Sequence, residues 1–301
     1  MKLCVVTVVS ADSFQYYIPL FIYTWKRAYP DVRVKVFLLG ELNPEVEKSL
    51  QLIRESGIRG FSVYTGAFSD ILPAAYHKSV PNVMRFLVPH KYLRRYDYAY
   101  ITDVDFLAFK HVPSHFRYNI RLLDGPIAAH RSPKRKPRRP EVYGKDGWRG
   151  IYARLAAGTV LIKVEEWYKR TKKIRAYYTR LLKTGAKDPV DKQHVGEYRE
   201  YDEVMLQRMC HHIGIGISEK RYHYKVGGKF NVLYRDVHLG DSKFRRHSSK
   251  KKMAKRIHKK NVKAFLSLEK DPVWQVIARR SGAVARIREA LRRMRKYTES
   301  I

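Results

Sequence analysis

The first 65 residues alternate between short apolar runs and segments whose apolar residues recur at helical spacing. The apolar runs are 3–9, 32–39 and 61–64. Their length and their content of valine predict buried strands. The segment from Phe14 to Trp25 predicts a helix with one core face, and the pair Asn43-Pro44 predicts the start of a second helix. This alternation predicts an α/β fold with a mostly parallel central sheet flanked by helices.

Two acids follow the next predicted strand, 98–102. Asp103 and Asp105 form the only Asp-x-Asp of the chain, and a second apolar run, 106–109, comes directly after them. Residues i and i+2 of an extended segment point to the same side, so we expect two adjacent carboxylates at the edge where parallel sheets bind ligands. A divalent cation such as Mg²⁺ or Mn²⁺ would remove their mutual repulsion. A solvated turn between strands is the alternative.

The chain is strongly basic. It has 62 Lys and Arg against 28 Asp and Glu, a formal net charge of +34. This excess attracts anions such as nucleic acid, acidic membranes, nucleotides and phosphorylated sugars, without choosing among them. The basic regions are 131–139, 243–260 and 275–296.

Two of these regions have further features. Proline and glycine around the first predict a basic mobile loop over 131–150. The last region predicts a helix with one apolar side and one arginine-rich side, which either docks on an anionic bilayer or packs on the rest of the chain.

Cysteine content and apolar patterning indicate the compartment. Cys4 and Cys210 are the only cysteines, and we expect two reduced thiols rather than a disulfide. The apolar run at the N-terminus is too short for a signal peptide, and no stretch approaches the ~20 apolar residues of a membrane span. We therefore expect a cytoplasmic protein that is soluble or peripheral on the inner face of a membrane.

Five motifs follow one another along residues 1–245. They are "HKSVPNVMRF" at 77–86, the Asp pair, "AAGTVLIK" at 156–163, "YDEVMLQRM" at 201–209 and "DVHLGDSK" at 236–243. In order and spacing they resemble the nucleotide-sugar glycosyltransferases of the GT-A fold, most closely family 8. That family pattern has an Arg-bearing helix, a strand ending in Asp-x-Asp, an Asn-Ala-Gly strand, an Asp-Gln-Asp helix start and a late His-x-x-Gly-x-x-Lys.

The resemblance implies roles for particular residues. The metal, Mn²⁺ or Mg²⁺, would be held by Asp103, Asp105 and His238. The nucleotide-sugar contacts would come from Thr7, Asp12, Ser13, Lys78, Arg85, Asp103 and Lys243. Among these, Lys243 would meet the leaving diphosphate, and Arg85 would contact the phosphates or the donor sugar. Without the resemblance, Arg85 reads as a helix-surface arginine.

Other positions depart from the family pattern. Ala156-Ala157-Gly158 stands in place of Asn-Ala-Gly, and Asp202-Glu203 in place of Asp-Gln. Ala128-Ala129-His130 lacks an acid that is common there, and one residue rather than two separates His238 from Gly240. These departures leave the donor sugar, the acceptor and the anomeric outcome open.

The expected activity is metal-dependent transfer of a hexose from a nucleotide diphosphate sugar, a UDP-sugar, to a hydroxyl of a glycan, lipid-linked or phosphorylated acceptor. Asp202 and Glu203 are the candidate catalytic residues, because carboxylates stabilise an oxocarbenium-like transition state. A retaining outcome is favoured, and in an inverting enzyme Glu203 would be the general base. Acids that only cap a helix N-terminus are the alternative.

We expect a catalytic domain over 1–245 and a basic helical extension over 246–301. Two other functions compete with glycosyl transfer. The net charge suits a nucleic-acid-binding protein, although no recognised nucleic-acid motif occurs. A nucleotidyltransferase of similar sheet topology would normally carry a Gly-rich phosphate loop after the first strand, where this chain has "VVSADS".

Overall fold

The computed structural model describes residues 1–12, 14–72, 79–108, 116–117, 120, 123, 125–130, 156–190, 192–197, 201–215, 237–238, 263, 266–280 and 292. The fold is α/β, with a mixed, mostly parallel central sheet flanked by helices, as the sequence predicts. The chain divides into two compact units. The first unit comprises 1–8, 66–103 and 119–225, and the second comprises 9–65, 104–118 and 226–301.

Four strands lie side by side in the first unit. In spatial order they are β1 (Leu3–Ser10), β4 (Tyr98–Thr102), β7 (Ala156–Lys163) and β6 (Ile127–His130). β1 and β4 are parallel, whereas β7 runs antiparallel to both β4 and β6. Leu3 pairs with Tyr98 at one end of the β1–β4 ladder, and Thr102 pairs with Thr159 at the other end of β4. Asp103 therefore follows directly after the carboxyl end of β4.

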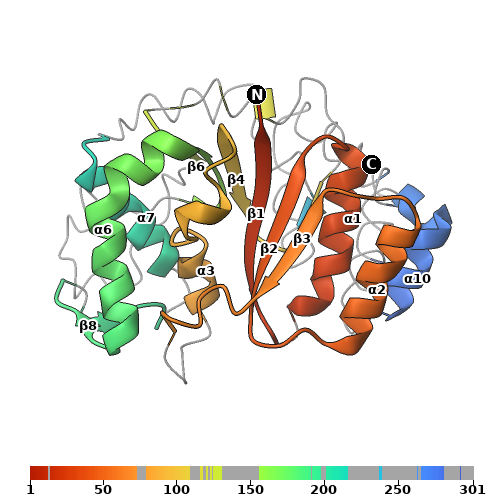
Figure 1. Ribbon diagram of the computed structural model, residues 1–301, viewed down its shortest axis with the longest axis horizontal. Coiled ribbons are helices and arrows are strands. Elements are labelled where there is room, and N and C mark those ends of the chain that lie inside the picture. The colour runs from red at the N-terminus through yellow and green to blue at the C-terminus, as the bar shows by residue number, and fades with distance from the viewer. Residues whose placement is uncertain are drawn as a thin grey trace. The chain divides into compact units, whose positions relative to one another are not determined.

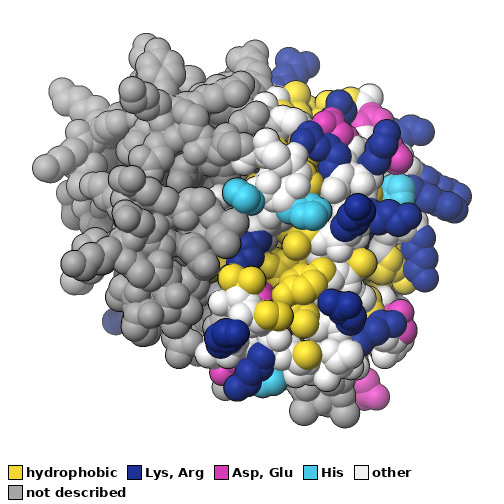
Figure 2. Space-filling model, turned by 90° about the vertical axis from the view of Figure 1, so that its left-hand side faces the viewer, with side chains coloured by type: hydrophobic (Ala, Val, Ile, Leu, Met, Phe, Trp, Pro, Cys, Tyr) yellow, Lys and Arg dark blue, Asp and Glu magenta, His cyan; other side chains and the backbone are white. Residues whose placement is uncertain are grey.

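The longest helix of this unit is α6 (Val164–Thr184), which follows β7 without a loop (Figure 1). Its inner side buries Trp167, Tyr168 and Leu181. Glu165 and Glu166 occupy its first turn, where acids complement the helix dipole. Gly185 ends the helix in a left-handed conformation at φ 65°, which glycine adopts without strain. Figure 2, which views the side of the molecule where α6 lies, shows more Lys and Arg than Asp and Glu among the coloured side chains.

The remaining elements of the first unit are short except for α7. They are α3 (Val80–Met84), η2 (His90–Tyr92), β8 (Lys187–Asp188), β9 (Gln193–His194) and α7 (Tyr201–His212). Asp188 of β8, with 0% exposure, joins its strand to α6 and α7. Its carboxylate accepts hydrogen bonds from Tyr177 of α6 at 3.1 Å, and from Tyr201 and Arg208 of α7 at 2.9 and 2.6 Å. A buried carboxylate needs such partners, and here they fix the position of α7.

The second unit contains the parallel strands β2 (Arg33–Leu39) and β3 (Phe61–Thr65) with the helices α1 (Ile18–Ala28) and α2 (Pro44–Glu55). A short 3₁₀ helix, η1 (Gln15–Tyr17), leads into α1. Asn43 caps α2 as predicted, since its side chain accepts the N–H of Glu45 at 2.9 Å. The two-residue strands β5 (Phe106–Leu107) and β10 (Val237–His238) pair antiparallel in the same unit.

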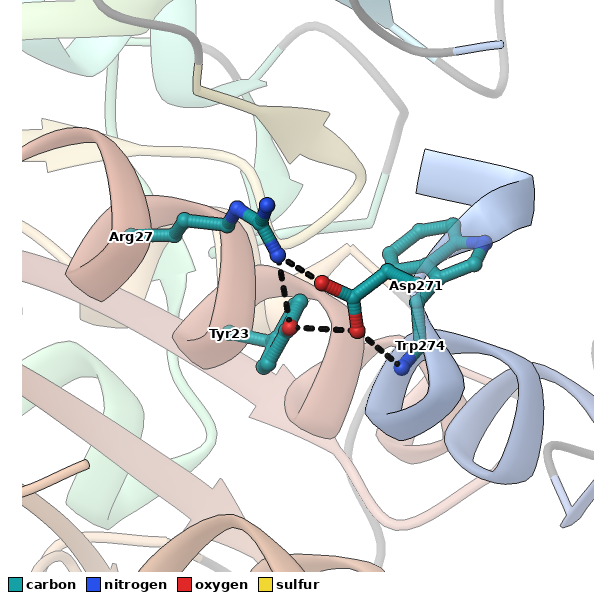
Figure 3. A network of polar contacts seen from close by, with 4 residues as sticks. All are labelled: Tyr23, Arg27, Asp271 and Trp274. Atoms are coloured by element: carbon teal, nitrogen blue, oxygen red, sulfur yellow. Dashed lines mark hydrogen bonds and ion pairs between the residues drawn. The ribbon is translucent and has the colours of Figure 1, made fainter. Parts of the chain in front are cut away.

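A C-terminal helix, α10 (Pro272–Arg280), packs on α1 and α2 after the 3₁₀ helix η5 (Leu268–Lys270). Figure 3 shows how Asp271 joins α10 to α1. The Asp271 carboxylate accepts the Tyr23 hydroxyl at 2.7 Å, pairs with Arg27 and caps α10 through the N–H of Trp274 at 3.0 Å. Trp274 and Ile277 are buried. The described part of the predicted basic helix therefore packs on the rest of the chain. Trp274 and Ile277 are covered by that packing and are not presented to a bilayer.

Some expectations need correction or fall outside the described residues. The strand expected over 106–109 is only the two-residue β5. Residues 131–150 and the proposed boundary at 245 lie outside the described residues.

Two further expectations concern the cysteines and the membrane. Cys4 and Cys210 are both buried and form no disulfide, which confirms the expected thiols. Among the described residues no helix combines the length and the apolar character needed to cross a bilayer.

Candidate functional site

Arg85 is the centre of the site in the first unit. It follows α3 directly and is 5% exposed, so the interpretation as a helix-surface arginine is wrong. Its Nη1 pairs with Oδ1 of Asp103, and its Nη2 donates to Oδ2 of Asp202 at 2.7 Å. Its Nε donates to the backbone oxygen of Asn82 at 2.7 Å. The guanidinium is therefore held on three sides and bridges the end of β4 to the start of α7.

Charge and burial compete in this cluster. Burial alone would lower the pKa of Arg85, but Asp103 and Asp202 outweigh it, so the pKa is raised and the cation is secured. Burial raises the pKa of Asp202, and Arg85 only partly opposes that effect. The like charge of Asp103 raises the pKa of Asp202 further. Because Asp103 and Asp202 share one arginine, Asp202 binds a proton more readily than a solvated aspartate does.

Asp103 stands where the sequence places it, immediately after β4. Its N–H donates to the backbone oxygen of Gly158 at 3.3 Å, so the Ala-Ala-Gly segment of β7 fixes its backbone. Its side chain is 29% exposed, unlike the buried Arg85 and Asp202. Asp103 is therefore the carboxylate of this cluster that solvent can reach.

The segment after Asp103 is not extended, contrary to expectation. Val104 and Asp105 form a turn before β5, and Asp105 is 7% exposed. The turn arises because the chain leaves β4 and enters a different strand pair, β5 with β10, within two residues. The alternation of sides in an extended strand therefore does not apply to the Asp pair.

The pairing of β5 with β10 has a consequence for His238. In its register His238 lies opposite Phe106, the residue that follows Asp105. The backbone of the second unit thus brings together two segments that are 132 positions apart in sequence. The side chain of His238 lies outside the described residues.

The two candidate catalytic acids begin α7. Asp202 and Glu203 lie in its first turn and are 5% and 7% exposed. Acids in this position complement the helix dipole, so the capping interpretation also fits. The ion pair of Asp202 with Arg85 goes beyond capping, because it joins α7 to the end of β4.

The residues expected near the nucleotide sugar differ in their exposure, and three of them lie outside the described residues. Thr7 is 0% exposed, and its hydroxyl has no hydrogen-bond partner among the residues that the structure describes. Asp12 is exposed, and its carboxylate accepts the N–H of Phe14 at 2.9 Å, which makes a local turn. Phe14 is 40% exposed, so it is not a core residue. Ser13, Lys78 and Lys243 lie outside the described residues.

The side chains of the Asp pair offer oxygen donors for a divalent metal ion. Carboxylate oxygens are the ligands that Mg²⁺ and Mn²⁺ prefer, and Asp103 offers one that solvent reaches. Among the residues whose side chains are described, no group of three or more His, Cys, Asp or Glu is arranged around a common point. Mg²⁺ and similar ions are commonly held by one or two protein carboxylates, with substrate phosphates as further ligands, and the Asp pair fits this pattern.

Sequence reasoning missed the bridge itself. It treated Arg85, Asp103 and Asp202 as separate contacts to a ligand, whereas the structure joins them to one another. It also missed Asp188 and Arg208, which hold the first unit around α7. No local signal marks such pairs, because each partner alone looks like an ordinary polar residue of a helix or turn.

No protein-family model matches the chain, and no curated protein matches its sequence. Several solved structures are similar in fold. A galactosyltransferase, LgtC, in complex with donor and acceptor sugar analogs is 14% identical with a TM-score of 0.42, over 69% of this chain and 70% of that one. The glycosyltransferase GlyE of Streptococcus pneumoniae TIGR4 is 14% identical with a TM-score of 0.43, over 75% and 49%. Mouse xyloside xylosyltransferase 1 is 10% identical with a TM-score of 0.41, over 68% and 81%. Likenesses this distant do not by themselves assign an activity.

Proposed function

We propose that this protein is a metal-dependent glycosyltransferase that moves a hexose from a nucleotide diphosphate sugar, a UDP-sugar, to an acceptor hydroxyl. The observation that carries the proposal is the buried bridge made by Arg85. It connects the first aspartate of the Asp-x-Asp motif to the first acid of α7. Three motifs that resemble those of one enzyme family thus meet at the carboxyl end of β4, the edge where α/β sheets bind ligands.

The residues expected to hold Mn²⁺ or Mg²⁺ are Asp103, Asp105 and His238. The pairing of His238 with Phe106 supports the part of this set that lies in the second unit, because it places the backbone of His238 opposite the residue that follows Asp105. A bound divalent ion would offset the negative charge that develops on the departing diphosphate.

Arg85 has two roles in this proposal. Its ion pair fixes the carboxylate of Asp103, so that the acid keeps one orientation while its exposed side remains open. Its guanidinium is also the buried cation nearest to that carboxylate in the described cluster, and we expect it to contribute positive charge to the diphosphate end of the donor. Lys78 and Lys243 would add charge from segments outside the described residues.

Asp202 and Glu203 would border the anomeric carbon. A carboxylate there stabilises positive charge on the sugar in the transition state. The raised pKa of Asp202 supports a group that can exchange a proton, and Glu203 would act as general base if the configuration inverts. We propose a retaining outcome and a glycan, lipid-linked or phosphorylated acceptor, in line with the family resemblance.

The test is release of UDP from a panel of UDP-sugars with Mn²⁺ present. We expect metal-dependent release that is lost in Asp103→Ala and Asp105→Ala. Asp31→Ala is the matched control, because Asp31 is an exposed acid of the second unit outside the site and should leave the rate unchanged. Absence of both UDP binding and UDP release across the panel would overturn the proposal.

Nucleic-acid binding is the second candidate, and the net charge of +34 favours it. Tight binding to DNA or RNA that weakens steeply with salt and is unchanged in Asp103→Ala and Asp105→Ala would support it over glycosyl transfer. Fluorescence anisotropy with labelled oligonucleotides measures this directly.

A further inference from the structure

The outer side of α6 carries a row of basic side chains. From Lys169 to the end of the helix the chain has no acidic residue. Successive residues of a helix turn by about 100°, so positions that are three, four, seven, eleven or fourteen apart share one side. The members of this row, which we term the α6 stripe, are Lys169, Lys172, Lys173, Arg180 and Lys183, and all five are exposed.

The α6 stripe is narrow and long. Its members fall within an arc of about 100° and extend over about 21 Å along the helix axis, from the helix geometry. Ala176 is the residue on the same line between its two groups, so no bulky side chain interrupts it. Figure 2, which faces the side of the molecule where α6 lies, shows basic side chains spread over this part of the surface.

The other two basic residues of α6 have structural partners. Arg170 pairs with Glu166 and donates to the backbone oxygen of Ile213. Arg175 donates to the backbone oxygens of Phe86, Leu87 and Val88 and lies over the ring of Tyr168. These bonds account for both arginines.

The stripe differs from them. Within the described part of the chain none of its five members forms an ion pair, and the guanidinium of Arg180 lies over the ring of Tyr177. Like charges three or four positions apart weaken a helix, so this arrangement does not serve the stability of α6.

We propose that the α6 stripe is a docking surface for an anionic lipid bilayer. Clusters of four to eight Lys and Arg on an amphipathic helix are typical of surfaces that bind acidic headgroups. The apolar side of α6 is buried in the first unit through Trp167, Tyr168 and Leu181, so the helix cannot insert. Contact is therefore electrostatic and lies along the membrane plane, where no fixed spacing of charges is required.

A nucleic acid fits the stripe less well. Faces that bind nucleic acid combine basic residues with Ser, Thr, Asn, Gln or Tyr, which bond to phosphate and sugar oxygens. Single-stranded nucleic acid also needs exposed aromatic rings for stacking. The α6 stripe consists of four lysines and one arginine, and the residue between its two groups is an alanine. This proposal concerns a surface of the first unit and does not depend on the proposed glycosyl transfer.

The experiment is flotation of the full-length protein with vesicles of phosphatidylcholine, with and without phosphatidylserine. The test variant combines Lys169→Gln, Lys172→Gln and Lys173→Gln, which keeps helix propensity and removes three charges. The control variant combines Lys48→Gln, Arg54→Gln and Arg59→Gln, which removes the same charge from exposed positions of the second unit. Far-ultraviolet circular dichroism and thermal unfolding verify that both variants fold.

We expect the wild type to bind only the vesicles that contain phosphatidylserine, with binding that weakens as salt rises. The α6 variant should lose at least about tenfold in the partition coefficient, since each basic residue near an anionic surface contributes about fivefold. The control variant should change by less than about twofold if the stripe is the contact surface.

Four outcomes overturn the proposal. The first is an equal loss in both variants, which would show binding through total charge. The second is vesicle binding that neither variant changes, and the third is no vesicle binding by the wild type. The fourth is an α6 variant that loses affinity for duplex DNA or RNA while its vesicle binding stays intact, which would assign the stripe to nucleic acid.

Discussion

Arg85 and Asp202 are 117 positions apart in sequence, yet a 2.7 Å ion pair joins Nη2 of the arginine to Oδ2 of the aspartate inside the first unit. Both side chains are buried, and Asp103 shares the same guanidinium. The bridge therefore couples the end of β4 to the start of α7, and it makes the proposed site part of the core rather than a set of surface groups.

Arg85→Met should be strongly destabilising. It leaves the buried carboxylate of Asp202 without its cation, and removal of one partner from a buried pair costs about 3–5 kcal/mol. Urea unfolding followed by circular dichroism measures the change. In Arg85→Met/Asp202→Asn the charge mismatch is absent, so the double variant should be more stable than the sum of the single effects predicts. Strict additivity would show that the two residues are not coupled.

The free energy of unfolding should depend on pH through Asp202. Burial raises the pKa of this carboxyl in the folded protein above its ordinary value of 3.8. As pH rises past 3.8, Asp202 loses its proton in the unfolded chain before it does so in the folded protein. Deprotonation therefore favours the unfolded chain, and the contribution of Asp202 to the free energy of unfolding falls until the pH passes the folded pKa. Above that pH the contribution no longer changes.

Urea unfolding at a series of acidic pH values, with Asp202→Asn as the reference, isolates this contribution. We expect the difference between wild type and variant to decrease as pH rises through the window that begins near 3.8. A difference that increases with pH would mean that Arg85 dominates and lowers the pKa instead.

Asp188→Asn should destabilise the first unit. It removes the negative charge that pairs with Arg208 at 2.6 Å, and Asp188 is fully buried. The expected cost in free energy of unfolding is about 3–5 kcal/mol for a broken buried pair. Tyr177→Phe is the control, because it removes one hydrogen bond to the same carboxylate and should cost about 1 kcal/mol. Chemical unfolding compares the two, and equal small effects would contradict the role of Asp188.

Trp274→Ala should show that α10 belongs to the second unit. Trp274 is 2% exposed, and loss of a large buried side chain costs about 3–5 kcal/mol. Arg27→Gln should change stability by less than about 1 kcal/mol, because Arg27 is 54% exposed and solvent screens its pair with Asp271. Limited proteolysis of Trp274→Ala should release the C-terminal segment, and wild-type resistance in this variant would show that α10 is held by other contacts.

The strands and helices before residue 65 were predictable because their signals are local. Valine-rich runs gave β1, β2 and β3 within about two residues, and Asn43-Pro44 marked the start of α2. The two thiols were predictable as well. The turn at Asp105 was not predictable, because the chain changes strand partners there and only the partner strand reveals it.

The sequence by itself determined an α/β fold, the positions of most strands and helices, and the place of Asp103 at the end of β4. Only the tertiary structure decided that Arg85 is buried between Asp103 and Asp202, that Asp188 anchors α7, and that Trp274 lies in the second unit. The reason is physical. Hydrophobic periodicity is written in neighbouring residues, whereas the partner of a buried charge is chosen by the packing of distant segments, which must satisfy that charge once water is excluded.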